Sequence, residues 1–253
     1  MDLAAGLKGR HVLVTGASSG LGDHFARLCA ACGAAVTVAA RRKDRLDALL
    51  AALEAAGSPR ARAVALDVAD ADSVEAAFAA LDDLPDVVVN NAGIAEGGAA
   101  IDTPLDVFDR VLATNLRGVW VMSTAAARRW RDAGRGGVIL NVASILGLRV
   151  AGGVGPYTVS KAAVVQMTEA LALEWARYGI RVNALAPGYI DTDINRDFFE
   201  SPAGTALVKR IPMRRLGQPS DLDGAFLLLA GEASAWMTGA TVPVDGGHLV
   251  SGL

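Results

Sequence analysis

The sequence predicts a single α/β domain, a doubly wound parallel sheet of about seven strands with helices on both faces. Short β-branched runs alternate with longer, alanine-rich stretches of helical period, which is the pattern of strand–helix–strand units. The runs are apolar with little alternation, as expected of strands that are buried on both faces. No repeat, composition break or long linker divides the 253 residues, so residues 1–253 are expected to form one domain.

The predicted strands and helices follow one another in regular order. Each strand is a short run rich in Val, Ile, Leu and Ala, and each helix is a longer segment between two such runs. Strands are expected at residues 11–15, 35–39, 63–66, 87–90, 138–142, 181–185 and 241–244, and helices at 22–31, 45–56, 73–81, 105–130, 157–178 and 220–231. Residues 188–217 are rich in Asp, Phe, Pro and Arg and are too long for an ordinary connection, which predicts a substrate loop.

Composition and charge exclude several classes of function. The chain has 24 basic and 27 acidic residues and a net charge of −3, which argues against binding to nucleic acid or to an anionic membrane surface. Hydrophobic residues make up 52% of the chain and charged residues 20%, which is ample for one large core. No uncharged apolar run approaches a membrane span, and residues 1–10 lack a secretory signal, so we expect a cytoplasmic protein.

Cys29 and Cys32 form a C-x-x-C pair, a spacing that also occurs in redox and metal sites. A single pair cannot supply four zinc ligands, and the three histidines do not stand at ligand spacing to it. The pair lies inside a predicted helix next to alanines. We therefore expect two packed thiols and no metal site.

A glycine-rich turn follows the first predicted strand directly, and a helical run follows the turn. Its glycines permit positive φ angles and close approach of the backbone, while the free N–H groups of the helix start face a pyrophosphate. The spacing is G-x-x-x-G-x-G, which predicts a cofactor loop formed by Gly16, Ser18, Ser19, Gly20, Leu21 and Gly22.

Tyr157 and Lys161 stand four residues apart at the start of a predicted helix and therefore share one face. A tyrosine has an ordinary pKa of about 10, and a nearby ammonium favours its phenolate form. Ser144 follows the strand at 138–142, at the edge of the sheet where α/β proteins bind ligands, and its hydroxyl can donate to a carbonyl oxygen. Asn115 is polar within a mostly apolar stretch, and is either a satisfied interior amide or the anchor of a solvent relay.

Together these motifs resemble the short-chain dehydrogenase/reductase family, in its single-domain form of about 250 residues with a Rossmann-type fold. The resemblance runs from about Lys8 to Gly247. It is carried by Thr15–Gly22, Asn90-Asn91-Ala92-Gly93, Asn115, Ser144, Tyr157-x-x-x-Lys161 and Pro187-Gly188. Ala143 stands where many members carry a second serine, but the spacing assigns catalysis to Ser144.

The resemblance implies a role for each of these positions. Tyr157 would be the general acid–base, Lys161 would hold the nicotinamide ribose and lower the tyrosine pKa, Ser144 would orient the carbonyl or alcohol, and Asn115 would position a water. Asp67 and Val68 would contact the adenine, and Asn91, with Ala92 and Gly93, would lie beside the ribose of the adenosine. Pro187 and Gly188 would lead to Ile190 and Thr192, which would hold the carboxamide.

The end of the second strand predicts the choice of cofactor. Dinucleotide-binding folds that select NAD place an acidic residue there, which accepts hydrogen bonds from the ribose 2′-hydroxyl. This chain has Ala40 at that position, followed by Arg41 and Arg42. Arg41 can bind a 2′-phosphate, with Arg42 or the Ser18 and Ser19 hydroxyls as further donors. The sequence therefore predicts NADP, with NAD possible.

The substrate is left open as a small ketone or secondary alcohol. The expected pocket wall includes Glu96, residues 145–155 and the loop at 188–217. Basic residues make this loop suited to an anionic or acyl-carrier substrate, although a solvated loop explains them equally well; they are Arg196, Lys209, Arg210, Arg214 and Arg215. The same loop is expected to act as a lid through Phe198, Phe199, Ile211 and Met213, with Pro202 and Gly204 interrupting any helix.

The sequence also gives an expected oligomeric state and two alternative functions. The helices at 105–130 and 157–178 carry apolar residues on more than one face, among them Val107, Val111, Val119, Val121, Val164, Val165, Met167, Leu171 and Trp175. With the strand at 241–244 they would form a homotetramer, as the resemblance implies. A sugar-nucleotide epimerase or dehydratase is disfavoured by the short chain and its glycine loop. A cofactor-binding sensor or scaffold without turnover is the other alternative.

Overall fold

The computed structural model describes residues 2–192 and 199–251, and it contains one parallel sheet of seven strands in the order β3-β2-β1-β4-β5-β6-β7. The strands are β1 (His11–Thr15), β2 (Ala35–Ala40), β3 (Ala61–Ala65), β4 (Val87–Asn90), β5 (Gly137–Val142), β6 (Ile180–Pro187) and β7 (Thr241–Val244). The predicted doubly wound sheet is thus confirmed. The order reverses between β1 and β4, which lie side by side, and such a switch point is where open α/β sheets bind ligands.

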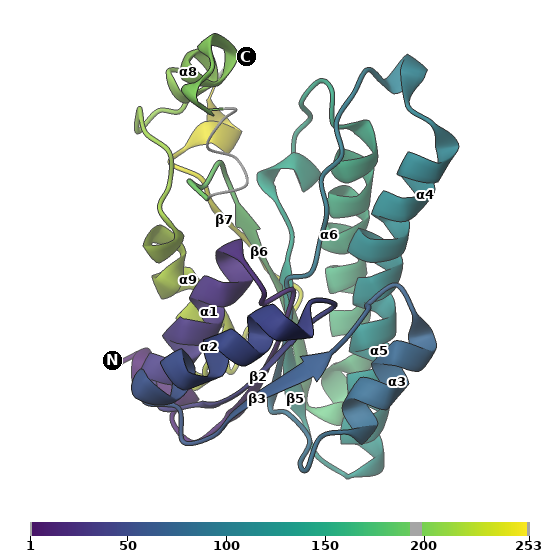
Figure 1. The fold of residues 1–253 in the computed structure, drawn as a ribbon, viewed down its shortest axis with the longest axis vertical. Coiled ribbons are helices and arrows are strands. Elements are labelled where there is room, and N and C mark those ends of the chain that lie inside the picture. Colours follow the sequence, from purple (N-terminus) through teal and green to yellow (C-terminus); the bar gives the residue numbers. More distant parts are fainter. Residues whose placement is uncertain (1, 193–198, 252–253) are drawn as a thin grey trace.

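Helices cover both faces of the sheet (Figure 1). On one face lie α1 (Gly20–Ala31), α2 (Lys43–Ala55) and α9 (Asp223–Ala230), and on the other lie α3 (Ala71–Ala79), α4 (Leu105–Leu112), α5 (Gly118–Asp132) and α6 (Gly155–Trp175). The short helix α8 is Pro202–Val208, and 3₁₀ turns are formed by Ala4–Leu7, Ala100–Asp102, Ile145–Gly147, Ala176–Tyr178, Pro219–Leu222, Glu232–Ser234 and His248–Val250. Among the described residues, no helix is long and apolar enough to cross a membrane.

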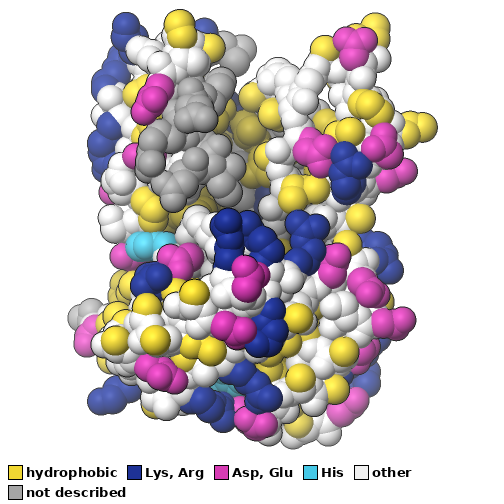
Figure 2. Space-filling model, viewed as in Figure 1, with side chains coloured by type: hydrophobic (Ala, Val, Ile, Leu, Met, Phe, Trp, Pro, Cys, Tyr) yellow, Lys and Arg dark blue, Asp and Glu magenta, His cyan; other side chains and the backbone are white. Residues whose placement is uncertain are grey.

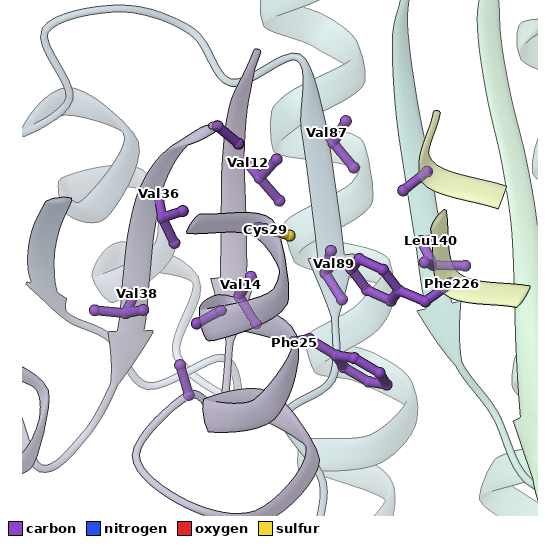
Figure 3. Packing of buried hydrophobic residues seen from close by; sticks show 14 of the residues in the cluster. Val12, Val14, Phe25, Cys29, Val36, Val38, Val87, Val89, Leu140 and Phe226 are labelled. Carbon is purple, nitrogen blue, oxygen red and sulfur yellow. The ribbon is translucent and has the colours of Figure 1, made fainter. Parts of the chain in front are cut away.

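The core has two layers because successive residues of each strand face opposite sides of the sheet. Val12 and Val14 of β1 pack under α1 and α9, whereas Leu13 packs on the side of α3 and α5. Figure 3 shows the first layer, where Phe25 of α1 stacks on Phe226 of α9 with ring centroids 4.4 Å apart. The central strands β1, β2, β4, β5 and β6 are therefore buried on both faces, as predicted, whereas the edge strands β3 and β7 are only partly buried.

The two cysteines are unpaired thiols, as the sequence indicated. Cys29 is fully buried within the first layer, where burial raises its pKa, and Cys32 ends α1. The part of the chain that the structure describes contains no group of three or more His, Cys, Asp or Glu residues that could hold a metal ion.

The helix expected at 105–130 is interrupted. Between α4 and α5, Ala113–Arg117 forms a single π-helical turn that contains Asn115. Such turns insert one extra residue and are frequent at functional sites. Here the Asn115 side chain bonds to the main chain at Ile94, a partner 21 residues away that helical periodicity cannot reveal.

The loop at 188–217 is more ordered than expected in its described part. Pro202 begins α8, with the Ser201 hydroxyl accepting a hydrogen bond from the Gly204 N–H, so Pro202 and Gly204 start a helix where an interruption was predicted. Ile211 is 2% exposed in this structure, and its part in a closing lid stays a prediction. Arg196 and Phe198 lie outside the described residues.

Candidate active site

A cleft of about 560 Å³ opens at the carboxyl edge of the sheet, along the switch point between β1 and β4. Figure 2 shows it as a hollow, with Lys and Arg side chains gathered at its lower end. The segments that follow the first six strands all contribute to its wall, and its lining includes Gly16, Ser18, Ser19, Gly20, Leu21, Arg41, Arg42, Asp67, Val68, Asn91, Ala92, Gly93, Ser144, Tyr157, Lys161, Pro187, Gly188, Ile190 and Thr192. Of the predicted catalytic and cofactor-binding residues, Gly22 and Asn115 are not part of this wall. Glu96 and residues 145–155, which the sequence placed in the wall of the substrate pocket, do not line it either, and the described part of the loop at 188–217 contributes Gly188, Ile190 and Thr192.

The glycine-rich loop forms a cradle that admits no side chains at its closest points. Gly16 has a φ of +68°, and a Cβ there would lie 2.7 Å from the Ala92 Cα. A Cβ at Gly22 would lie 2.4 Å from the Gly16 carbonyl oxygen, so Gly22 packs behind the loop and lets helix and strand approach each other. No side chain caps the start of α1, which leaves its first N–H groups directed at the cleft.

Asn91, which follows β4, and Thr15, the last residue of β1, brace this loop. The Asn91 amide donates to the carbonyl oxygens of Thr15 (3.0 Å) and Gly16 (3.3 Å). The Thr15 hydroxyl accepts from the backbone N–H groups of Asn91 and Ala92 at 3.0 and 3.1 Å. Asn91 lines the cleft, as predicted, but its amide is used to position the loop. The sequence interpretation gave Thr15 no such role, although it stands directly before the loop.

The end of β2 presents two arginines and no carboxylate to the cleft. Ala40 is buried, and Arg41 and Arg42 both line the wall. Arg42 donates to the Ser18 hydroxyl at 2.9 Å, which joins the strand end to the glycine-rich loop. A guanidinium held in this way suits a phosphate monoester, because the fork can bind two oxygens of one group.

Tyr157 and Ser144 meet at the other end of the cleft. Tyr157 lies in the first turn of α6, and Ser144 caps the 3₁₀ turn Ile145–Gly147 by accepting from the Leu146 N–H at 3.1 Å. Burial raises the pKa of the Tyr157 phenol, and the hydrogen bond to the Ser144 hydroxyl opposes that rise. A tyrosine and a serine whose hydroxyl groups are hydrogen-bonded can both contact a substrate oxygen placed between them. The tyrosine can then exchange a proton with that oxygen.

Lys161 is buried one helical turn beyond Tyr157. Its Nζ donates to the Val142 carbonyl oxygen at 2.7 Å and lies 5.6 Å from the centroid of the Tyr157 ring. Burial lowers the pKa of Lys161 to about 8. In this structure burial raises the pKa of Tyr157 overall, and the lowering of that pKa by Lys161 stays a prediction.

Asn115 is completely buried and acts on the site through neighbours. Its Oδ1 accepts from the Ile94 N–H at 2.8 Å, and its Nδ2 donates to the Ile94 carbonyl oxygen at 2.8 Å and to the Ser160 Oγ at 3.1 Å. Ser160 in turn donates to the Tyr157 carbonyl oxygen at 2.7 Å. The Asn115 amide is thus satisfied in the interior, and its role in a solvent relay stays a prediction. Ser160 was missed because its position before a lysine gives no chemical signal.

Close backbone packing also shapes the wall after β6. A Cβ at Gly188 would lie 2.7 Å from the Asp245 Cα, so only glycine fits there. Ile190 and Thr192 then reach the cleft, together with Ile94, Ala95 and Thr114, which the sequence did not single out.

One elongated cleft contains the glycine-rich loop, the uncapped start of α1, the two arginines Arg41 and Arg42, and the buried Lys161. These residues fit a dinucleotide cofactor whose phosphates meet the loop.

Comparison with known proteins agrees with this geometry. A family model described as enoyl-(acyl carrier protein) reductase matches residues 16–248. L-rhamnose 1-dehydrogenase (NAD(P)(+)) of Azotobacter vinelandii is 40% identical over 247 residues, which cover 95% of this chain and 96% of that protein.

Two solved structures have the same fold along nearly their whole length. A gluconate 5-dehydrogenase from Burkholderia cenocepacia, in complex with NADP and tartrate, is 34% identical with a TM-score of 0.92 and covers 98% of this chain and 99% of that one. A putative 2-deoxy-D-gluconate 3-dehydrogenase from Agrobacterium tumefaciens, with bound NADP, is 37% identical with a TM-score of 0.91 and the same coverage. Given the family model and these relatives, the chain belongs to the short-chain dehydrogenase/reductase family.

Proposed function

We propose that this protein is an oxidoreductase that transfers a hydride between NADP(H) and a small secondary alcohol or its ketone. The observation that carries the proposal is the pairing of the Tyr157 phenol with the Ser144 hydroxyl in the cleft that also contains the glycine cradle. The relatives named above are sugar and sugar-acid dehydrogenases, which supports a polyhydroxylated substrate. No observation favours a sensor or scaffold without turnover.

In this proposal each residue has a separate task. A bound nicotinamide supplies or accepts the hydride. The Tyr157 hydroxyl gives a proton to the substrate oxygen in reduction and takes it back in oxidation. The Ser144 hydroxyl hydrogen-bonds to the same oxygen and stabilises the charge that develops on it. Lys161 contacts the ribose, and Asn115 holds Ile94 and Ser160 so that the cleft wall and the first turn of α6 keep their places.

A substrate panel tests the function. Purified protein is mixed with NADP⁺ and a series of polyols, sugars and sugar acids, or with NADPH and the matching ketones, and absorbance of the reduced nicotinamide is followed. We expect turnover with at least one polyhydroxylated compound. Cofactor binding without turnover on the whole panel would instead favour the sensor or scaffold.

Cofactor binding is expected to depend on pH through Lys161. Its pKa of about 8 in the cofactor-free protein means that the ammonium is present below that pH and is lost above it. The cofactor is anionic and favours the ammonium, so NADPH should bind more weakly as pH rises through about 8. Lys161→Ala should bind NADPH more weakly and show a flat profile. Titration of NADPH fluorescence at several pH values measures the affinity of the wild type and of the variant. A flat pH profile for the wild type would contradict the assignment of Lys161 to the cofactor.

We also propose that the protein is a homotetramer built on α4, α5, α6 and β7. Val111, Val119, Val164 and Leu171, which the sequence placed among the candidates, are buried in the monomer core. The exposed apolar residues are instead Trp120 of α5 and Val159 and Leu173 of α6, with exposed fractions of 49%, 50% and 85%. Exposed apolar side chains on α5 and α6, which lie on the same face of the sheet, support a surface that is covered in an assembly.

Light scattering at micromolar concentration checks the assembly. We expect a mass of four times the 26.0 kDa subunit. Leu173→Glu should lower the mass without unfolding the subunit, whereas Ala51→Glu, at an exposed position of α2 on the other face of the sheet, should leave the mass unchanged. A monomeric wild type would refute the proposal. The two unpaired cysteines fit a reducing compartment, so the proposal includes a cytoplasmic location. The proposal also keeps residues 188–217 as the substrate loop.

A further inference from the structure

The helix that carries Tyr157 and Lys161 meets the sheet through small apolar side chains. Val164, in the middle of the buried face of α6, belongs to one core cluster with Ala143, which follows β5, and Ala184 of β6. Alanine side chains form shallow ridges, so a contact of this kind gives a helix few points at which it interlocks with the sheet. The register of α6 along the sheet therefore depends strongly on its polar contacts.

Side-chain hydrogen bonds join the buried face of α6 to successive residues of β5. The Lys161 Nζ donates to the Val142 carbonyl oxygen at 2.7 Å. The Thr168 Oγ1 accepts from the Asn141 Nδ2 at 2.9 Å. Lys161 and Thr168 stand two helical turns apart, which is about 10 Å along the helix axis. Anchors at two such points fix both the position of a rigid helix along the sheet and its rotation about its own axis.

The Thr168 hydroxyl is completely buried and is held in one orientation. It donates its proton to the Val164 carbonyl oxygen of the preceding turn at 2.8 Å, so a lone pair is left to face β5. The Asn141 amide is also completely buried, and its Oδ1 accepts from the Asn90 Nδ2 at 2.9 Å. The Asn141 Nδ2 is thereby directed at Thr168. Both partners of the Asn141–Thr168 bond are held in the orientation that the bond needs.

The same network of side chains reaches α5 at its other end. The Nδ2 of Asn90, on β4, also donates to the Ser123 Oγ of α5 at 2.9 Å, and both residues are buried. The network thus ends in a hydroxyl on each of two helices, and α6 is the one of the two that carries Tyr157. Buried polar contacts add little net stability over apolar packing, but they can select one register among several.

We infer that Thr168 is a positioning residue for the reaction, which acts by fixing α6 against β5 through the Asn141 amide. Tyr157 belongs to α6, whereas Ser144 stands two residues after the end of β5. The Asn141–Thr168 bond therefore sets the distance between the two hydroxyls that meet the substrate oxygen. This inference rests on the proposed function, which places that oxygen between Tyr157 and Ser144.

Substitutions at Thr168 separate the hydrogen bond from the packing. Thr168→Val keeps the size and branching of the side chain but removes the hydroxyl, so the Asn141 Nδ2 loses its acceptor. Thr168→Ser keeps the hydroxyl and removes one methyl group, which costs packing only. Thr168→Cys has a weaker acceptor and should lie between these two variants, which guards against a folding defect in Thr168→Val. Ser123→Ala is the matched control, because it removes the hydroxyl at the other end of the network.

Steady-state kinetics on the substrate found in the panel give the first measurement. Thr168→Val should lower kcat by about ten- to a hundredfold, because a displacement of about 1 Å at a reacting group has an effect of that order. The KM for the substrate should change by less than about threefold, because the contact that is lost is made in the transition state. Thr168→Ser and Ser123→Ala should keep kcat within about threefold of the wild type, although their melting temperatures also fall. A loss of stability alone would lower kcat in step with the melting temperature in all of these variants.

The second measurement does not need turnover. The chain has three tyrosines, so labelling of the tyrosine rings with ¹³C gives NMR signals that single Tyr→Phe substitutions can assign. In the cofactor-free protein, Thr168→Val should displace the Tyr157 signal. The signal of Tyr189, which follows β6, is the internal reference and should keep its position. In Thr168→Ser and Ser123→Ala both signals should stay where they are in the wild type.

An unmoved Tyr157 signal in Thr168→Val would overturn the inference, and so would a kcat within about threefold of the wild type. An equal displacement of that signal in Ser123→Ala would also overturn it, because the effect would then belong to the network and not to Thr168. Failure of the proposed function is seen in the wild type instead, as the absence of hydride transfer from every compound of the panel. The tyrosine signals still decide the positioning of Tyr157 in that case, so the two failures are distinguishable.

Discussion

Tyr157→Phe is expected to lower kcat by roughly 10²- to 10⁴-fold, the usual contribution of a general acid–base group. The change removes one hydroxyl at nearly constant shape from a side chain in the wall of the cleft. The Ser144 hydroxyl then keeps only its bond from the Leu146 N–H, and no other phenol occupies the first turn of α6. Folding should be preserved, since the ring and its packing remain.

The measurement is steady-state turnover on the substrate found in the panel, together with NADPH binding and the melting temperature. Tyr178→Phe is the matched control, because Tyr178 lies in the 3₁₀ turn Ala176–Tyr178 beyond the far end of α6. It should change kcat by no more than about twofold. Retention of more than about a tenth of the wild-type kcat in Tyr157→Phe would remove Tyr157 from the chemistry.

A preference for NADP over NAD of roughly ten- to a hundredfold is the second large effect expected. One charge-assisted hydrogen bond to a phosphate contributes about 1.5–3 kcal/mol, which is about ten- to over a hundredfold in kcat/KM. The structure supports it through Arg41 and Arg42, which line the cleft, and through Ala40, which offers no carboxylate to repel the phosphate. The bond from Arg42 to Ser18 holds one guanidinium beside the loop before any ligand binds.

The double variant Ala40→Asp, Arg41→Ala should reverse this preference. The new carboxylate can accept hydrogen bonds from a ribose 2′-hydroxyl and would repel a 2′-phosphate. Lys43→Ala is the control, because it removes a positive charge from the start of α2 that pairs with Asp47 and does not line the cleft. Catalytic efficiencies with both cofactors give the result. Equal or better efficiency of the wild type with NAD would show that Arg41 does not read a phosphate.

The local sequence determined the elements and most of the cleft wall. The strands at 11–15, 87–90 and 241–244 have the predicted bounds, because each is a short apolar run between polar or glycine-containing turns. Cofactor and reactive residues could be placed because, in a parallel α/β sheet, the segments after successive strands converge on one edge. Gly16, Arg41, Asn91, Ser144 and Tyr157 meet there for that reason alone.

Tertiary structure decided what depends on partners distant in the sequence. The π-helical turn at Asn115 forms around Ile94, and Gly22 is required by contact with Gly16 and Asn91. The direction of the Tyr157 pKa follows from burial, which no spacing between residues 157 and 161 reveals. Periodicity and motif spacing report neighbours along the chain, whereas dielectric environment and charge pairing depend on neighbours in space.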